Sequence, residues 1–521
     1  MVENGRPRVI ASREGYSTIP SIVAISEKGQ ILVGHPAKTQ MITNPALTVY
    51  GSKRLVGRHY QSPIVEEVRN RTHYHVIPGP AGEAAVGLGN LAMTLEEVSA
   101  LLLLEAKQLA EAHLGRPVHR AVITCPAFYN ERQRQAVRTA GLLAGLYVER
   151  VVNEPTAAAL AFGYGKGLTR RIAVFDLGGG TFDATVLELK RDTYEVLSTG
   201  GDTFLGGVDF DNLLTDYLLD TFENQTGVPF RGDRVALQRI IDAAEMAKKS
   251  LTDAERHRVH IPYITTMNNQ PVDLDITVDR VTLEQLYQQL VERSVRVLDE
   301  VIRARHMTPG DIDDILLVGG MTRMPAVRIR LKRYFGKDPQ KGVHPDEAVA
   351  LGAALLANAI EQHEGVKLKD VLPMSIGVGL PQGRFKVVLP RNTPLPMSKK
   401  YTLPTTKDNQ KSLELHVFQG EDETVDRCEL LGTLAFDKLP KGSKGTVRVE
   451  VTFKLNEECI LNLSAKELST GREMEASMTT KGTPMEVRRK LGMEERRIQG
   501  TSAGGRSSGF IAFLKKLFRI G

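Results

Sequence analysis

The stretch Phe175-Asp176-Leu177-Gly178-Gly179-Gly180-Thr181-Phe182-Asp183 lies between two apolar segments and decides how the chain is interpreted. Three glycines in a turn between strands remove the side chains that would keep a ligand away from the main chain, so that successive N–H groups can converge on phosphate oxygens. Asp176 and Asp183, one at each end of the turn, are well placed to hold the water shell of a hydrated Mg²⁺. The alternative is a glycine-rich hairpin with surface aspartates, but two aspartates together with Thr181 are more than a turn requires.

Two other glycine pairs follow strand-like segments. Gly319-Gly320 end the apolar residues 314–318, and ligand sites in α/β sheets lie at such strand ends. Gly206-Gly207 follow residues 202–205. The chain has no GxxxxGK[ST] segment, which excludes a Walker-type NTPase.

The composition of the 521 residues, with 41% apolar and 25% charged residues, predicts a globular protein of about three domains. Trp is absent and aromatic residues make up only 6%, so we expect no stacking platform for nucleic acid and no nucleic-acid partner. Cys125, Cys428 and Cys459 lack metal-ligand spacing and fit a reducing cytoplasm. No apolar run approaches the length that spans a bilayer and no leader pattern opens the chain, so we expect a cytoplasmic protein.

The net charge of +6 is confined to the end of the chain. Residues 482–521 contain nine Lys and Arg against three Asp and Glu, and the remainder is neutral. A neutral body with a basic tail argues against a nucleic-acid-binding body and for a specialised end.

Four regions follow one another along the chain. Residues 1–362 alternate β-branched runs with helical patterns, as α/β units do. Residues 363–370 (HEGVKLKD) are a predicted linker, residues 371–481 show the short alternating strands of an all-β domain, and residues 482–521 form the tail.

These features in this order resemble the seventy-kilodalton heat-shock chaperone family, the DnaK-type proteins, whose nucleotide domain has the actin and sugar-kinase fold. The resemblance runs from about residue 8 to residue 481. Besides residues 176–183, it is carried by Tyr16-Ser-Thr-Ile-Pro-Ser21, Ser52-Lys-Arg-Leu-Val-Gly57, Cys125-Pro-Ala-Phe-Tyr-Asn130, Asn153-Glu-Pro-Thr-Ala-Ala-Ala159, Gly201-Asp-Thr-Phe-Leu-Gly-Gly207, Leu317-Val-Gly-Gly-Met-Thr-Arg323, His344-Pro-Asp-Glu-Ala-Val349, Lys407-Asp-Asn-Gln410, Leu415-His-Val-Phe-Gln-Gly-Glu421 and Ile460-Leu-Asn-Leu-Ser-Ala-Lys466.

The resemblance implies an α/β, actin-like, two-lobed nucleotide-binding domain over residues 1–362 followed by an all-β sandwich that binds peptides over residues 371–481. It implies a chaperone that binds ATP with Mg²⁺, hydrolyses it slowly and couples this to transient binding of unfolded polypeptide segments. The implied protein partners are a J-domain cochaperone and a nucleotide exchange factor. Two rival functions are a non-hydrolysing peptide-binding or scaffold protein on the same frame, and a carbohydrate kinase or actin-like filament protein, which the β domain disfavours.

Site roles also follow from the resemblance. It makes Lys53 the catalytic lysine near the γ-phosphate and Glu154 the carboxylate that orients Mg²⁺ and the attacking water, while Thr181 supplies a hydroxyl contact beside the aspartates that hold Mg²⁺ through water. The resemblance places one helix face at the ribose and adenine, namely Glu245, Lys248, Lys249 and Thr252. Arg323 is expected to stack on adenine. The implied nucleotide-contacting residues are Gly178, Gly179, Gly180, Thr181, Gly206, Gly207, Glu245, Lys248, Lys249, Thr252, Gly319, Gly320, Arg323 and Asp346.

Two further sets complete the resemblance. Pro126 and Arg134 match an interdomain relay. An apolar slot for an extended peptide is expected to be lined by Val378, Leu380, Leu403, Leu413 and Leu415. Apolar residues at alternate strand positions are equally typical of plain core, so both interpretations stay open for each of them.

The chain departs from the family at four places. The family opens with a strand and an Asp-Leu-Gly-Thr-Thr-type loop, whereas this sequence has Met1-Val2 before the turn signal Asn4-Gly5, which predicts that in-frame codons upstream encode the strand. The linker alternates with lysines, Pro381 and Gln382 replace a small-residue arch over the slot, and about 40 residues stand in place of a long helical lid. We therefore expect weaker coupling and faster release of peptide.

The tail ends in residues 510–520, which predict a basic amphipathic helix at the inner membrane surface. Phe510, Phe513, Leu514, Leu517 and Phe518 share one helical face, and Lys515, Lys516 and Arg519 share the other. The alternative is that the apolar face docks on the β sandwich or on a partner protein.

Overall fold

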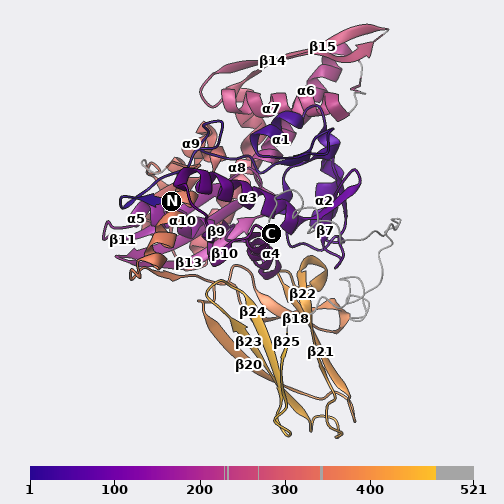
Figure 1. Cartoon of the computed structure of the whole chain (residues 1–521), viewed down its shortest axis with the longest axis vertical. Coiled ribbons are helices and arrows are strands. Elements are labelled where there is room, and N and C mark those ends of the chain that lie inside the picture. Colours follow the sequence, from indigo (N-terminus) through magenta and orange to yellow (C-terminus); the bar gives the residue numbers. More distant parts are fainter. Residues whose placement is uncertain (228, 231–233, 268, 341–343, 477–521) are drawn as a thin grey trace.

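The computed structural model describes residues 1–227, 229–230, 234–267, 269–340 and 344–476. An α/β part, residues 1–362, lies above an all-β part, residues 371–476, in the view of Figure 1. The tail residues 482–521, including the predicted amphipathic helix at 510–520, lie outside the described residues.

A five-stranded sheet forms the centre of the α/β part. Its strand order is β16-β11-β12-β13-β17, with β11, β12 and β13 antiparallel and with β16 and β17 parallel to their neighbours. The bounds are β11 (Thr169–Leu177), β12 (Phe182–Lys190), β13 (Thr193–Asp202), β16 (Asp314–Val318) and β17 (Lys367–Lys369). The glycine turn, residues 178–180, therefore connects two antiparallel strands, as predicted.

Smaller sheets surround this centre. A parallel pair joins β9 (Arg120–Cys125) and β10 (Tyr147–Asn153), and a long hairpin at the end remote from the sandwich joins β14 (Arg256–Met267) and β15 (Gln270–Asp279) (Figure 1). The remaining short strands are β1 (Val2–Glu3), β2 (Arg6–Pro7), β3 (Val23–Ile25), β4 (Ile31–Val33), β5 (Thr48–Val49), β6 (His75–Pro78), β7 (Ala84–Leu88) and β8 (Leu91–Thr94).

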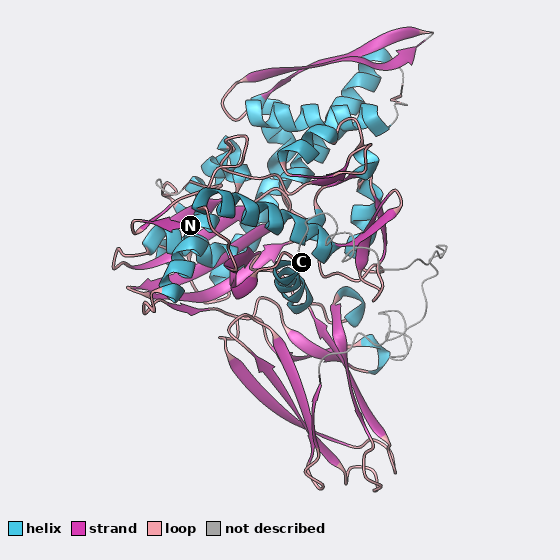
Figure 2. Ribbon diagram, viewed as in Figure 1, coloured by secondary structure: helices cyan, strands magenta, loops and turns pink. Residues whose placement is uncertain are grey.

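Helices cover both faces of the five-stranded sheet (Figure 2). They are α1 (His35–Gln40), α2 (Pro63–Arg71), α3 (Leu95–Leu114), α4 (Glu131–Leu143), α5 (Glu154–Gly163), α6 (Gly207–Thr226), α7 (Arg234–Ser250), α8 (Arg280–Arg303), α9 (Pro325–Phe335) and α10 (Ala348–Glu361). Short 3₁₀ helices are η1 (Pro45–Leu47), η2 (Ser52–Arg54), η3 (Pro309–Asp311) and η4 (Gly320–Arg323).

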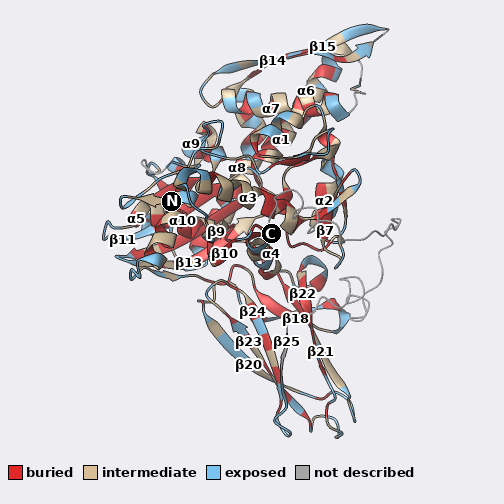
Figure 3. Cartoon of the chain, in the orientation of Figure 1, coloured by how far each residue is buried: buried red, intermediate tan, exposed pale blue. Residues whose placement is uncertain are grey.

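Strand β11 shows why helices must cover both faces of the five-stranded sheet. Ala173, Phe175 and Leu177 belong to one buried cluster with residues of α6 and α8, whereas Ile172 and Val174 belong to another with residues of α5. Successive strand residues point to opposite faces, so an apolar run with no polar alternation must be buried on both sides. The centre of the α/β part is accordingly buried (Figure 3).

The helix that begins at Leu95 starts as the sequence predicts. The side chain of Thr94 accepts from the N–H of Glu97 and the Glu97 carboxylate accepts from the N–H of Thr94, which is a capping box. The same reciprocal pattern joins Asn130 and Gln133 at the start of α4. These caps satisfy N–H groups that the first helical turn leaves without partners.

The all-β part is a sandwich of two four-stranded antiparallel sheets. One has the order β19-β18-β21-β22 and the other β20-β23-β24-β25, with an apolar core between them. The bounds are β18 (Ile376–Gly379), β19 (Phe385–Leu389), β20 (Met397–Pro404), β21 (Ser412–Gln419), β22 (Glu429–Asp437), β23 (Arg448–Leu455), β24 (Leu461–Glu467) and β25 (Glu473–Ala476), with 3₁₀ helices η5 (Pro381–Gly383) and η6 (Val425–Arg427).

The predicted linker is partly a strand. Residues 367–369 form β17, which pairs in parallel with the edge strand β13 through Thr193, Tyr194 and Glu195. An alternation of two exposed lysines around the half-buried Leu368 fits an edge position, where one side of the strand meets water. The linker thus extends the sheet of the α/β part before the chain enters the sandwich.

Asn4 and Gly5 form the turn of a short hairpin between β1 and β2, both with positive φ, as the Asn-Gly signal predicts. Among the described residues, no helix is long and apolar enough to cross a membrane.

Candidate functional site

Three glycine segments that are far apart in the sequence meet at one place. The N–H groups of Gly207 and Val208, at the start of α6, donate to the carbonyls of Gly178 and Gly179, each at 2.9 Å. Gly319, at the end of β16, lies against the carbonyl of Leu177. The sequence predicted each glycine segment separately, and the fold brings them together.

The close approach explains why two of these positions are glycine. A Cβ on Gly206 would lie 2.6 Å from the backbone of Gly180, and a Cβ on Gly319 would lie 2.4 Å from the carbonyl oxygen of Leu177. Gly319 also has a φ of 81°, which other residues rarely adopt. At Gly179, by contrast, an added Cβ would meet no protein atom within 4 Å, so this glycine faces open space.

Lys53, Glu154, Asp176 and Asp183 gather beside the glycine turn. The Lys53 ammonium donates to the Glu154 carboxylate at 2.7 Å, and its side chain is 43% exposed. Asp176 and Asp183 are directly opposite each other on β11 and β12 and are buried. The N–H of Phe128 donates to Asp183 at 2.9 Å, which fixes that carboxylate.

The group carries more negative than positive charge, and the pKa values reflect it. Burial, followed by the charges of Glu154 and Asp183, raises the pKa of Asp176 well above its usual range. Burial and Glu154 raise the pKa of Asp183 to about 7. Burial alone would lower the pKa of Lys53, but the carboxylates, Glu154 foremost, outweigh it and raise that pKa.

A cation would relieve this imbalance, and the residues fit a hydrated one. Within the described ranges, no three His, Cys, Asp or Glu side chains converge as direct metal ligands. Mg²⁺ keeps most of its water shell and needs few protein oxygens, so the two buried aspartates suit it through water. The donor set is all oxygen, which matches a hard divalent cation.

The predicted ribose and adenine contacts lie on and just after α7. Glu245 accepts from Lys38 at 2.9 Å and from Lys249 at 2.6 Å, and these two cations lower the pKa of Glu245 to about 2 against the opposing effect of its burial. Lys248 is buried, pairs with Asp211 at 2.8 Å and donates to the carbonyl of Gly207. This places the helix beside the glycine segments.

One of these positions is not on the helix. The sequence predicted Thr252 on the same helix face, but α7 ends at Ser250 and Thr252 lies in the following turn, where its hydroxyl donates to the carbonyl of Lys248. On the other side of the site, Arg323 and Asp346 form an ion pair at 2.5 Å, and Gly320 lies against Asp346. Thr181 is buried in the glycine turn.

Sequence reasoning missed Arg54. Its guanidinium binds both oxygens of Asp209 in buried contacts and donates to the partly buried carbonyl of Gly180 at 2.9 Å. Asp209 also accepts from the N–H of Gly206 at 2.8 Å and so caps α6. In the sequence, Arg54 is visible only as an arginine directly after Lys53, and such an arginine is ordinarily a solvated surface charge.

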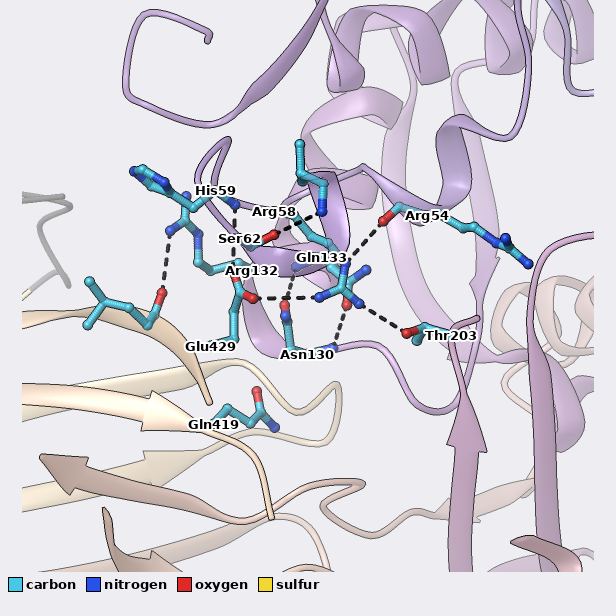
Figure 4. A network of polar contacts seen from close by, with 12 residues as sticks. Arg54, Arg58, His59, Ser62, Asn130, Arg132, Gln133, Thr203, Gln419 and Glu429 are labelled. Carbon is cyan, nitrogen blue, oxygen red and sulfur yellow. Dashed lines mark hydrogen bonds and ion pairs between the residues drawn. The ribbon is translucent and has the colours of Figure 1, made fainter. Parts of the chain in front are cut away.

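A polar network connects this arginine to the β sandwich (Figure 4). Arg58 donates to the carbonyl of Arg54 at 3.0 Å and pairs with Glu429, the first residue of β22, at 3.5 Å. Both partners are mostly buried, with side chains 6% and 14% exposed, and burial lowers the pKa of Arg58 despite Glu429. The N–H of Glu131 donates to Gln419 at 3.0 Å and the side chain of Arg132 to the carbonyl of Leu430.

The predicted relay residues lie near a second group of interdomain contacts. Arg134 is buried and donates to the carbonyls of Ala127 and Tyr129, close to Pro126. Asp370, at the end of the linker, accepts from Asn153 at 2.6 Å.

Ion pairs and main-chain contacts extend this second group. Arg138 binds Glu458, and Arg150 pairs with Glu457 at 3.1 Å. On the far side of the linker, Asn392 accepts from the N–H of Thr199 and Arg391 donates to the carbonyl of Thr199. The two parts of the chain are thus held together by polar contacts from several loops.

The five predicted slot residues are all half-buried and occupy one half of the sandwich. The side chains of Val378, Leu403, Leu413 and Leu415 pack against the edge of its core. They face the interior because their cross-strand neighbours do: Leu413 is opposite the buried Phe436, and Leu403 is opposite the buried Val449. Leu380, just after β18, is half-buried as well.

The chain was also compared with protein families. Residues 1–497 match the model described as the Hsp70 protein family, which covers well over half of the 521 residues. The match includes the glycine segments, the acidic group with Lys53, the linker and the whole sandwich described above. The chain therefore belongs to the Hsp70 protein family.

Proposed function

We propose that this protein is a chaperone that binds ATP at the glycine segments, hydrolyses it slowly and uses the hydrolysis to control binding of unfolded polypeptide in the sandwich. Hsp70 proteins are chaperones and generally ATPases. The single observation that carries the proposal is the convergence of three glycine segments beside Lys53, Glu154, Asp176 and Asp183. In this proposal residues 1–362 form a two-lobed, actin-like nucleotide domain.

Each residue of the group has a chemical task in hydrolysis. The main chain around Gly179, where space is open, would approach the phosphates. Lys53 would stabilise the charge that develops as the terminal phosphoryl group leaves. Glu154, held by Lys53, would orient the attacking water, and Asp176 and Asp183 would hold the water shell of Mg²⁺. Mg²⁺, when bound, would neutralise part of the phosphate charge.

The buried contacts give a route from nucleotide to sandwich. Arg54 binds the carbonyl of Gly180 in the glycine turn, and Arg58 binds both the carbonyl of Arg54 and Glu429 of the sandwich. A shift of the glycine turn on loss of the terminal phosphate would displace Arg54 and weaken the Arg58–Glu429 contact. The interface has two discrete arrangements in this proposal, docked and released.

The partners in this proposal are unfolded or extended polypeptide segments, a J-domain cochaperone and a nucleotide exchange factor. Hsp70 proteins generally bind unfolded polypeptides and cochaperones. We place the protein in the cytoplasm, with the tail at 510–520 as a possible peripheral contact to a membrane.

An ATPase assay on the full chain, with and without an unfolded peptide, tests the function. We expect slow turnover that needs Mg²⁺ and that rises when peptide is added. Binding of ATP with no turnover under either condition would contradict hydrolysis and leave a peptide-binding scaffold. No binding of either ATP or peptide would contradict the function as a whole.

A further inference from the structure

Exposed lysines surround the half-buried slot residues of the sandwich. We call Lys386, Lys399, Lys407 and Lys411 the slot cations. None of them has an ion-pair partner within the part of the sandwich that the structure describes. Their positions relative to the slot residues decide whether they meet a bound peptide.

Lys386 lies on the interior face of its strand. It is directly opposite Val378 across the β18–β19 ladder, and residues opposite each other point to the same face. Val388, two residues further along β19, is buried in the sandwich core on that same face. Lys386 is nevertheless exposed, so its side chain extends from the interior face to solvent.

Lys399 lies on the facing sheet, close to β19. It shares a face of β20 with Tyr401 and Leu403, its ammonium lies 5.2 Å from the centre of the Tyr401 ring, and it donates to the carbonyl of Val388 in β19 at 3.1 Å. Lys399 therefore reaches from one sheet edge to the other while its charge stays uncompensated by a carboxylate.

Lys407 and Lys411 belong to the loop between Leu403 and Leu413. This loop is fixed to a neighbouring loop: the N–H of Asn409 donates to the carbonyl of Gly442 at 2.8 Å, and Asp408 accepts from the N–H of Lys444 at 2.6 Å. Asp408 accepts one main-chain N–H and keeps its negative charge, so the loop carries two lysines and one aspartate.

Two further carboxylates, those of Glu414 and Glu450, lie on strands next to the slot residues but point outward. Glu414 lies between two interior-facing leucines, so it points to the outer face of its sheet. Glu450 pairs with Lys400, which alternates with Lys399 and also points outward. The four slot cations, on the interior face or in the loop between Leu403 and Leu413, therefore outnumber the one carboxylate of that loop, that of Asp408.

Three acidic side chains of the sandwich lie where it contacts the α/β part. Glu429, Glu457 and Glu458 bind Arg58, Arg150 and Arg138 of the α/β part. The sandwich thus meets its own nucleotide domain through carboxylates and presents lysines at the slot. A bound segment with carboxylates beside its apolar residues would complement that charge.

We propose, resting on the peptide binding proposed above, that the slot selects apolar segments flanked by Asp and Glu. The apolar residues of such a segment bury the exposed parts of Val378, Leu403 and Leu413, and its flanking carboxylates meet the slot cations. The same apolar segment flanked by Lys or Arg binds more weakly because like charges face each other.

Two labelled peptides with the same four-leucine core, flanked by Asp pairs or by Lys pairs, test this on the full chain by fluorescence anisotropy. We expect the acidic peptide to bind about ten-fold more tightly at low salt, the sum of a few exposed charge pairs, and the difference to shrink in high salt. The double variant Lys386→Glu/Lys411→Glu should reverse the order. A Lys454→Glu control, on the outer face opposite Ser398, should leave it unchanged.

The outcomes separate the two proposals. Equal affinities, or tighter binding of the basic peptide, overturn the acidic preference and leave peptide binding in place. If neither peptide binds, peptide binding itself is wrong and the preference with it. If the variant Lys386→Glu/Lys411→Glu unfolds the sandwich, the variant Lys386→Gln/Lys411→Gln is measured instead. It must reduce the preference for the acidic peptide to about three-fold, and an unchanged preference overturns the assignment.

Discussion

The proposed nucleotide site and the proposed peptide slot differ in how closely their backbones approach and in the sign of their charge. In the first, backbone segments approach so closely that only glycine fits, and buried carboxylates outnumber the single lysine. In the second, ordinary apolar side chains are left half-buried and are surrounded by lysines that have no carboxylate. The first site lacks positive charge, which Mg²⁺ would supply together with the nucleotide, and the second lacks negative charge, which carboxylates of a bound segment would supply.

The largest effect should come from the backbone contact at the nucleotide site. In Gly206→Ala the new Cβ would meet the Gly180 backbone at 2.6 Å, and neither segment can move freely because Gly207 and Val208 bond the turn. We expect the free energy of unfolding to fall by about 3 kcal/mol and ATP affinity to fall by about 100-fold or more. Thermal unfolding and calorimetric titration measure both.

Gly310→Ala is the matched control, since its Cβ would make only an ordinary 3.6 Å contact with Thr308. An equal loss in both variants would mean that glycine at position 206 has no special steric role.

Next in size is the chemical role of Lys53. Lys53→Ala should slow ATP hydrolysis by about 100-fold, because its charge acts mainly as phosphate charge redistributes, while ATP affinity changes less than about ten-fold. Single-turnover hydrolysis and equilibrium binding separate the two quantities. Lys190→Ala, which removes an exposed pair with Glu188, is the control. Turnover at the parent rate in Lys53→Ala would remove Lys53 from the catalytic group.

Two of the interdomain glutamates, Glu429 and Glu457, differ in burial and should differ in effect. Glu429→Gln leaves the buried Arg58 unpaired and should weaken docking of the sandwich by about 3 kcal/mol. Glu457→Gln breaks a pair in which the glutamate is 60% exposed and should cost about 0.5 kcal/mol. Hydrogen exchange of the β17 amides reports docking. Equal protection in the two variants would rule out a special role for Arg58.

The smallest effect is a pH dependence of the nucleotide-free protein. The pKa of Asp183 is about 7 in the folded chain and near 3.8 when unfolded, so the folded state binds the extra proton between these values. Stability should therefore fall as pH rises from 5 to 7, by about 1 kcal/mol per pH unit from this group.

Asp183→Asn should flatten the dependence of stability on pH. Other groups, such as Glu131, whose pKa burial also raises to about 7, contribute equally in the parent and the variant, so their contribution cancels in the difference. Denaturant unfolding at several pH values is the measurement. Parallel curves for the two proteins would show that Asp183 does not carry the proton.

The glycine segments of the proposed nucleotide site were visible in the sequence, and at Gly206 and Gly319 the reason is steric, because a Cβ at either position would meet the backbone of another segment. The sequence placed Thr252 on the face of α7, but the helix ends at Ser250, and nothing in the residue type of Thr252 indicates that end. The slot leucines were ambiguous because core and slot use the same side chains at the same spacing.

Arg54 and Arg58 could not be found in this way. Their role depends on partners about 150 and 370 residues away, Asp209 and Glu429, and an arginine in a charged segment is ordinarily solvated. The linker strand was missed for a related reason, since three residues carry too little periodicity to predict a strand, and pairing with β13 decides the matter.

That short strand also protects the molecule against its own copies. With β17 in place, the main-chain groups of Thr193 and Glu195 along the edge of β13 are occupied. If the sandwich is released as proposed, this edge becomes a template on which another chain could add a strand. Lys367 and Lys369 make the freed segment itself a poor recruit, because two such segments side by side would bring four ammonium groups together. In the proposed cycle of docking and release, the lysines in the linker would thus let a sheet edge open and close repeatedly without seeding aggregation.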